Sequence, residues 1–294
     1  MSNHNSKICG FTFVRNAEKF DYPVIESINS ILPICDKFII CLGNSDDNTE
    51  MMIKSINSPK IEIIHSIWDD SLREGGVVLS VETNKAFDAI PEEYDWCFYI
   101  QADEVVHESY LKAIKEATQK YNDNKEVEGL LFHYKHFYGS YNYYGDSRKW
   151  YRREIRIIRN NKQIRSHGDA QGFRINGNKL KVKLIPAYIF HYGWVKSPFK
   201  QKEKQKYFNK LWHDDNWMKK NIKEDDHYDY FQIDSLSEFK ETHPEVMIER
   251  IKKADWDFSF NINQKKLDFL TKLLYLFEKI TGKRLFEYKN YEII

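Results

Sequence analysis

The chain has 294 residues, a length that suits one large domain or one domain with an added lobe. Its 45 Lys and Arg residues against 44 Asp and Glu residues leave a formal net charge of +1, so no general attraction to nucleic acid is expected. No run of about 18 apolar residues occurs, which argues against a membrane-spanning helix. The four cysteines show no C-x-x-C pairing, and three lie in predicted strands, so we expect a reduced, cytoplasmic protein.

Strands alternate with helices through the first third of the chain. Apolar runs bounded by turn residues predict strands at 7–14, 37–42, 61–65 and 96–100. Between them we predict helices at 25–32, after the polar turn at 43–49, and at 77–89. Because parallel neighbours need long crossover connections, this alternation predicts right-handed βαβ units and a parallel sheet.

The fourth predicted strand ends at two adjacent carboxylates, Asp103 and Glu104. Residues 96–100 are all apolar, which is typical of a strand buried on both faces. Open α/β sheets bind ligands at the carboxyl ends of their strands, and a half-buried carboxylate there needs a counter-charge such as a divalent cation. The alternative role for these acids is to cap the helix that follows.

After residue 126 the pattern changes to strands separated by aromatic, glycine-containing loops. Strands are predicted at 129–134, 154–159 and 181–191, and the chain is helical and strongly charged from 197 onward. No domain boundary is evident. We therefore expect the second half to extend the same sheet and to cover one end of it.

Four motifs follow one another in the first part of the chain: VRNAE at 14–18, GNSDDNT at 43–49, TNKA at 83–86 and QADE at 101–104. In this order they resemble the motifs of family 2 glycosyltransferases with the GT-A fold. In that family the first strand ends in an N-E-E-like loop, the second in a D-G-S-x-D-x-T-like turn, and the fourth in an Asp-x-Asp or Asp-Ala-Asp-Glu-like motif. The later FHYGW at 190–194 also looks like a segment of the bacterial members.

The sequence departs from the family pattern at two places within this resemblance. Gln101 stands where the first acid of the Asp-x-Asp motif is found. Leu42 and Gly43 lie where an acid commonly ends the second strand and reads the nucleobase. The metal would therefore depend on the second acid of the motif, and the base of the nucleotide is left open.

The resemblance implies a GT-A, Rossmann-like and mostly parallel central sheet flanked by helices. A catalytic domain would span 1–195, with a nucleotide-sugar-binding half at 1–125 and an acceptor-side half at 126–195, followed by a helical extension at 196–294 packed on it. It also implies a metal-dependent, inverting transferase. Such an enzyme moves a sugar from a nucleotide-diphosphate donor to a glycan or lipid-linked acceptor, for example in surface polysaccharide biosynthesis.

A Mg²⁺ or Mn²⁺ ion is implied as the cofactor, because the leaving diphosphate must be neutralised. Asp103 is the expected ligand, helped by Glu104. His191, at the end of the predicted strand segment 183–190, is the candidate for a further ligand. For His191 a core or turn histidine bonded to the backbone is the alternative.

An inverting transfer also needs a base that takes the proton of the acceptor hydroxyl. Asp169, in the glycine-flanked loop at 165–173, is the candidate, and an ordinary turn aspartate is the alternative. Together with Asp103, the candidates for donor binding are Arg15 and Lys85 at the diphosphate, the neighbouring Asn84, and Asp47 at the nucleoside. Arg15 and Lys85 would equally be surface cations, and Asp47 would equally serve as a helix cap.

Two other functions remain open. A sugar nucleotidyltransferase would need a glycine-rich loop after the first strand, and residues 11–20 contain no glycine. A non-catalytic nucleotide- or sugar-binding protein of the same fold is favoured by Gln101 in place of an acid. Nucleic acid is not expected as a partner.

The C-terminal segment at 265–281 carries an apolar stripe with basic flanks. Leu267, Leu270, Leu274 and Phe277 lie on one side, and Gly282 is a stop signal. This helix would either pack on the domain or rest as a peripheral element on the inner face of a membrane.

Overall fold

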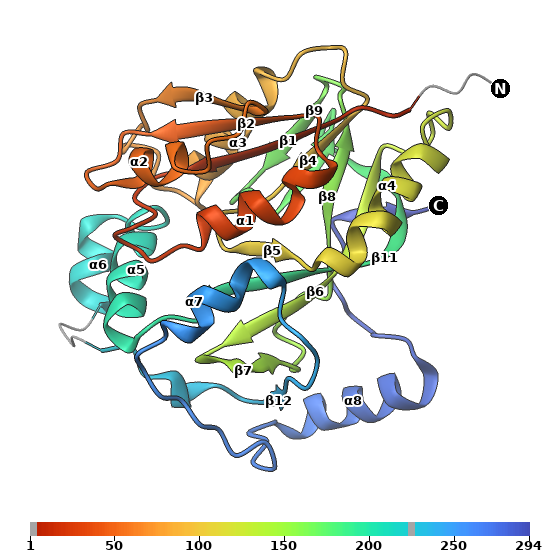
Figure 1. Cartoon of the computed structure of the whole chain (residues 1–294). Coiled ribbons are helices and arrows are strands. Elements are labelled where there is room, and N and C mark those ends of the chain that lie inside the picture. The colour runs from red at the N-terminus through yellow and green to blue at the C-terminus, as the bar shows by residue number, and fades with distance from the viewer. Residues whose placement is uncertain (1–4, 223–226) are drawn as a thin grey trace.

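The first third of the chain forms an α/β unit around four parallel strands. The computed structural model describes residues 5–222 and 227–294 (Figure 1). These strands have the spatial order β3-β2-β1-β4, and every neighbouring pair is parallel, which confirms the parallel sheet predicted for this part. Their bounds are Ile8–Val14 for β1, Lys37–Gly43 for β2, Ile61–Ser66 for β3 and Trp96–Tyr99 for β4.

Helices cover both faces of these strands. Helices α1 (Val24–Ile31) and α4 (Leu111–Lys120) contribute to the apolar cluster on one face, and α3 (Val77–Asp88) contributes to the cluster on the other. Side chains alternate between the faces of a strand, so Ile8 of β1 belongs to the first cluster and Cys9 to the second. This two-sided burial explains the nearly continuous apolar composition of the central strands.

Beyond β4 the sheet is mixed, which corrects the prediction of a mostly parallel sheet. Strand β8 (Arg153–Arg159) runs antiparallel between β4 and β6 (Gly129–Tyr138), whereas β11 (Asn178–Trp194) is parallel to β6. Several later strands are joined by short turns, such as the two-residue turn between β10 and β11 at Asn176 and Gly177, both with positive φ. A tight turn makes consecutive strands antiparallel, and the predicted crossover rhythm therefore ends at β4.

The described strands together form one 13-stranded sheet, and segments from the last third join it. Strand β13 pairs with β11 and β12 pairs with β7, so residues 196–294 are not purely helical. The remaining strands are β5 (Glu104–Val106), β7 (Ser140–Gly145), β9 (Ile164–His167), β10 (Gly172–Ile175), β12 (Leu236–Glu238) and β13 (Tyr291–Ile293). The remaining α-helices are α2 (Thr49–Lys54), α5 (Pro198–Lys210), α6 (Asp215–Asn221), α7 (Ile248–Lys252) and α8 (Phe269–Thr281). Short 3₁₀ helices lie at Leu32–Ile34, Glu108–Tyr110, Tyr230–Gln232 and Glu245–Met247.

In the described ranges, no helix has both the length and the apolar character needed to cross a bilayer. The four cysteines carry free, buried thiols. Cys9, Cys41 and Cys97 lie in β1, β2 and β4, as predicted, and Cys35 precedes β2. Burial raises the pKa of the Cys9 and Cys41 thiols to about 12. These cysteines therefore act as small apolar residues of the sheet.

Candidate functional site

A cavity of about 380 Å³ lies at the carboxyl ends of β1 and β4. Strand β1 has β2 on one side and β4 on the other, so this is the topological switch point at which open α/β sheets bind ligands. Residues 13–15 and 101–103 line the cavity from the strand ends, and α5 supplies much of the opposite wall. Four predicted site residues meet here: Arg15, Asp103, Asp169 and His191.

Asp103 is held between a lysine and a histidine. Its Oδ2 atom lies 3.1 Å from Nζ of Lys204 and 3.7 Å from Nε2 of His191. The Lys204 ammonium also donates to the carbonyl oxygen of Gly193 at 2.9 Å. Burial, the largest single influence, would raise the pKa of Asp103, but the neighbouring basic groups together, with Lys204 first among them, hold that pKa well below its usual range. Asp103 is therefore an anion in the cavity wall.

The tautomer of His191 follows from its neighbour His136. Nε2 of His136 lies 2.9 Å from the carbonyl oxygen of Tyr151, and because that oxygen can only accept, Nε2 must carry the proton. Burial lowers the pKa of both imidazoles, so both are neutral at neutral pH and Nδ1 of His136 is an acceptor. Nδ1 of His191 therefore donates to Nδ1 of His136, at 3.2 Å. Its Nε2 lone pair then faces Asp103.

These two side chains fit a divalent cation that shares its ligands with a substrate. The donors are one anionic carboxylate oxygen and one neutral imidazole nitrogen on the same wall. Over residues 5–222 and 227–294, no cluster of three or more His, Cys, Asp or Glu side chains could hold an ion alone. Mg²⁺ and similar ions are commonly bound by one or two side chains and completed by substrate phosphates and water. The set suits such an ion and not a permanent structural one.

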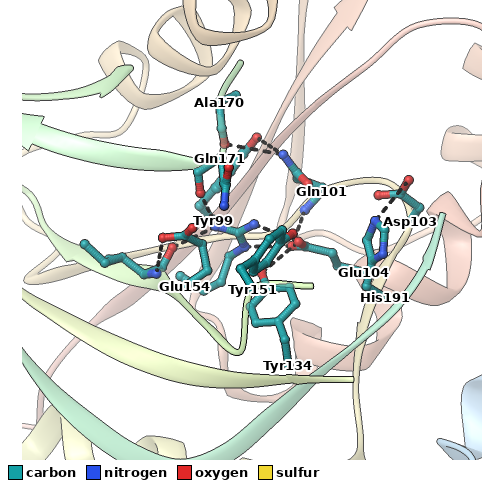
Figure 2. A network of polar contacts seen from close by, with 12 residues as sticks. Tyr99, Gln101, Asp103, Glu104, Tyr134, Tyr151, Glu154, Ala170, Gln171 and His191 are labelled. Carbon is teal, nitrogen blue, oxygen red and sulfur yellow. Dashed lines mark hydrogen bonds and ion pairs between the residues drawn. The ribbon is translucent and has the colours of Figure 1, made fainter. Parts of the chain in front are cut away.

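Glu104 lies in a buried ion pair outside the cavity wall (Figure 2). Both Glu104 and Arg156 are fully buried, and the guanidinium binds the carboxylate through two bonds of 2.7 and 2.8 Å. The hydroxyl of Tyr134 donates to Oε1 at 2.8 Å, and the backbone N–H of Gln101 donates to Oε2 at 3.1 Å. These four bonds occupy both carboxylate oxygens, so Glu104 serves to hold the end of β4.

Gln101 ties the end of β4 to the loop that carries Asp169 (Figure 2). Its side-chain amide donates to the carbonyl oxygen of Ala170 at 3.3 Å, and Arg156 donates to that of Gln171 at 2.9 Å. Ala170 has a φ of 63°, a left-handed conformation that costs a non-glycine residue about 1–2 kcal/mol. The side chain of an ionised aspartate at position 101 would have no N–H to donate. The glutamine therefore makes a hydrogen bond to this loop that the acid could not make.

Arg15 lines the cavity, whereas Asp47, Asn84 and Lys85 do not. The Arg15 guanidinium lies 5.4 Å from the ring centre of Trp68 and pairs with Asp70 at 2.7 Å. Asp47 accepts from the backbone N–H groups of Lys19 and Thr49, which is a loop-closing role. Asn84 exchanges hydrogen bonds with the backbone of Ser166, and Lys85 pairs with Glu82 at 2.6 Å.

Lys204 is the site residue that the sequence reasoning missed. It lies on α5, about one hundred positions after Asp103, within a run of five lysines between 200 and 210 that otherwise reads as a solvated helix. Gln201, three positions before it, and Phe208, four positions after it, also line the cavity, which is the spacing of one helix side. The available sequence signal was this spacing, which puts a lysine on one helix side with a glutamine and a phenylalanine.

No known protein-family model matches the chain, and no curated protein matches it. Solved structures show a distant likeness. TarS from S. aureus in complex with UDP has a TM-score of 0.41 and 14% identity, over 69% of this chain and 64% of that one. Glucosyl-3-phosphoglycerate synthase from Mycobacterium tuberculosis, in complex with Mn²⁺, UDP and phosphoglyceric acid, has a TM-score of 0.31 and 16% identity, over 45% of this chain and 43% of that one.

A third similar structure is 4-diphosphocytidyl-2C-methyl-D-erythritol synthase from Anaerococcus prevotii. Its TM-score is 0.41 and its identity 13%, over 70% of this chain and 95% of that one. The chain spans less than two thirds of the TarS and mycobacterial chains that it matches. These likenesses concern the general arrangement of strands and helices, and the assignment of chemistry depends on the residues of the cavity.

Proposed function

We propose that this chain transfers a sugar from a nucleotide-diphosphate donor to a hydroxyl group of a glycan or lipid-linked acceptor. The observation that carries the proposal is the convergence of Asp103 and His191, with 3.7 Å between Oδ2 and Nε2, on a cavity at the switch point. The cations of Arg15 and Lys204 line the same cavity. A carboxylate, a neutral imidazole and two cations suit a bound diphosphate and a divalent ion better than a neutral ligand.

In this proposal each residue has a defined task. Asp103 and His191 would hold Mg²⁺ or Mn²⁺, which supplies Lewis-acid stabilisation of the diphosphate when bound. Arg15 and Lys204 bind phosphate oxygens. As the bond from the anomeric carbon to the diphosphate oxygen breaks, its electron pair stays with the diphosphate. The acceptor oxygen forms a bond on the opposite face of the sugar, and its proton passes to the carboxylate of Asp169.

Calorimetric titration with UDP, GDP and dTDP tests the donor site. We expect one of the three to bind in the presence of Mn²⁺, and Asp103→Asn to weaken that binding at least tenfold, because the substitution removes the anionic ligand. The matched control is Asp88→Asn, an exposed aspartate paired with Arg165 away from the cavity, which should bind as the wild type does. If no nucleotide bound with or without Mn²⁺, the transferase proposal would be wrong.

Assays with nucleotide sugars and with nucleoside triphosphates separate the other functions. A binding protein of the same fold would bind the nucleotide sugar without releasing the nucleotide over time. A sugar nucleotidyltransferase would bind a nucleoside triphosphate and a sugar phosphate instead. Release of the nucleotide diphosphate from its sugar therefore marks the transferase.

Lys204 provides a second test within the same cavity. Removal of its ammonium in Lys204→Gln should weaken the affinity for the nucleoside diphosphate about tenfold, as expected for the loss of one charge-assisted hydrogen bond. The nucleoside monophosphate, which lacks the outer phosphate, should lose little. Lys202→Gln removes a charge from the same helix at a position outside the cavity wall and is the control. Equal losses for diphosphate and monophosphate would contradict a contact between Lys204 and the outer phosphate.

A further inference from the structure

Helix α8 presents a continuous apolar face to solvent. Among the described residues, more than half of the large apolar side chains that are exposed lie within 269–288, so the exposure is concentrated and not scattered. On the helix itself they fall within about 120° of its circumference. These are Phe269 (78% exposed), Leu270 (64%), Leu273 (48%), Leu276 (56%), Phe277 (38%) and Ile280 (75%). We call this set the α8 apolar face.

The opposite side of α8 is fixed to the protein, so the apolar face cannot turn inward. The hydroxyl of Tyr275 donates to the carbonyl oxygen of Asp146 at 2.6 Å. Glu278, one turn further, pairs with Arg148 at 2.6 Å and Arg152 at 3.1 Å. Asp268 caps the first turn and Gly282 ends the helix in a left-handed conformation. The caps therefore set where the helix begins and ends, and the contacts of Tyr275 and Glu278 set which side of it faces the protein.

Exposed cations accompany the α8 apolar face. Lys272 and Lys279 lie two turns apart at one border of the face, and Lys283 follows the helix end, all three exposed. The acids near them are Asp268, which caps the helix, and Glu278, which is paired with arginines on the inner side. The outer side of α8 thus combines bulky apolar and positively charged groups. Phe286, which follows the helix in the chain, is 91% exposed.

We infer that α8 docks on the surface of an anionic phospholipid bilayer. An amphipathic helix with lysines beside its apolar face lies in the interface plane, with the apolar side chains buried about 5–10 Å among the lipids. Its 13 residues span about 20 Å, too short to cross the membrane but long enough to lie on it. α8 lies at the end of the molecule opposite β1–β3 (Figure 1), so docking leaves the first strands away from the lipid.

A second copy of the chain fits this face less well. An antiparallel two-fold contact between two α8 apolar faces would place the lysine border of one copy beside that of the other. Like charges placed side by side at an interface oppose association. The phosphates of an anionic bilayer, in contrast, attract the same lysines.

Flotation with vesicles tests this inference. We expect the full chain to float with phosphatidylcholine vesicles that contain about 30% phosphatidylglycerol and to bind pure phosphatidylcholine much more weakly. The double variant Leu273→Glu/Leu276→Glu should lose at least nine tenths of the bound protein. Its matched control is Met51→Glu/Ile67→Glu, which adds the same charge at two exposed apolar positions far from α8 and should float as the wild type does.

One further double variant, raised salt and thermal unfolding complete the test. Lys272→Gln/Lys279→Gln should reduce binding to the anionic vesicles several-fold, and raised salt should do the same. Equal thermal unfolding of all variants would show that the fold is intact, since every altered side chain is exposed. Absence of wild-type binding to anionic vesicles at low salt would overturn the inference. A second result would also overturn it: sedimentation of the wild type as a dimer and of Leu273→Glu/Leu276→Glu as a monomer. The α8 apolar face would then join two copies of the chain.

Discussion

Replacing Glu104 with leucine is expected to lower the free energy of unfolding by about 3–5 kcal/mol, because the fully buried guanidinium of Arg156 would lose its counter-charge. That is a large part of the total stability of a typical domain, about 5–15 kcal/mol. The variant should also loosen the Asp169 loop, since Arg156 donates to the carbonyl oxygen of Gln171. Denaturant unfolding at neutral pH measures the change.

The double variant Glu104→Leu/Arg156→Met separates the burial of a lone charge from the loss of a useful contact. It should be clearly more stable than Glu104→Leu alone, because no uncompensated charge remains. Asp88→Leu, which breaks the half-exposed pair with Arg165, should cost less than about 1 kcal/mol. A cost below about 1 kcal/mol for Glu104→Leu would contradict the structural role assigned to this glutamate.

Asp169→Asn is expected to reduce kcat for the proposed transfer by about 10²–10⁴-fold while nucleotide binding changes little. The amide cannot take the proton of the acceptor hydroxyl, whereas its size and shape match those of the carboxylate. In the structure Asp169 Oδ1 accepts from the backbone N–H of Gln171 at 3.3 Å, a bond that an asparagine carbonyl also makes. The assay follows release of the nucleotide diphosphate from the donor sugar that calorimetry identifies.

Asp229→Asn is a matched control for this variant. Asp229 accepts from the backbone N–H two residues later, at 2.9 Å, in the same local geometry but outside the cavity wall. It should keep the kcat of the wild type. Near-normal turnover of Asp169→Asn would remove Asp169 as the base and leave it as an ordinary turn aspartate. A loss of nucleotide binding equal to the loss of turnover would assign it to donor binding instead.

The sequence predicts the first four strands well because their signal is local. Each strand is a short apolar run bounded by turn residues, and the helices between them carry their apolar residues on the side that faces the sheet. The cavity follows from the same information, since the carboxyl ends of β1 and β4 must lie beside each other in a parallel sheet. Arg15 and Asp103 were found in this way.

Pairings between distant segments were not predictable from local patterns. Lys204 reaches Asp103 from a helix about one hundred positions later, and Arg156 reaches Glu104 across 52 positions from β8. Whether the acid at 104 faces the cavity or the core depends on β5, a three-residue strand whose pairing with β11 places Glu104 beside His191. A strand this short has no periodicity to read, and a shift of one residue exchanges the two faces.

The four buried cysteines can report on opening of the parallel part of the sheet, because they lie in or beside β1, β2 and β4. In the folded chain, burial keeps the thiols protonated and out of contact with reagents, and it raises the pKa of the Cys35 thiol as well as those of Cys9 and Cys41. Alkylation at these positions must therefore wait for β1, β2 or β4 to separate from the sheet. The rate of labelling thus measures how often these strands open, and a bound nucleotide that bridges β1 and β4 would slow it without any engineered probe.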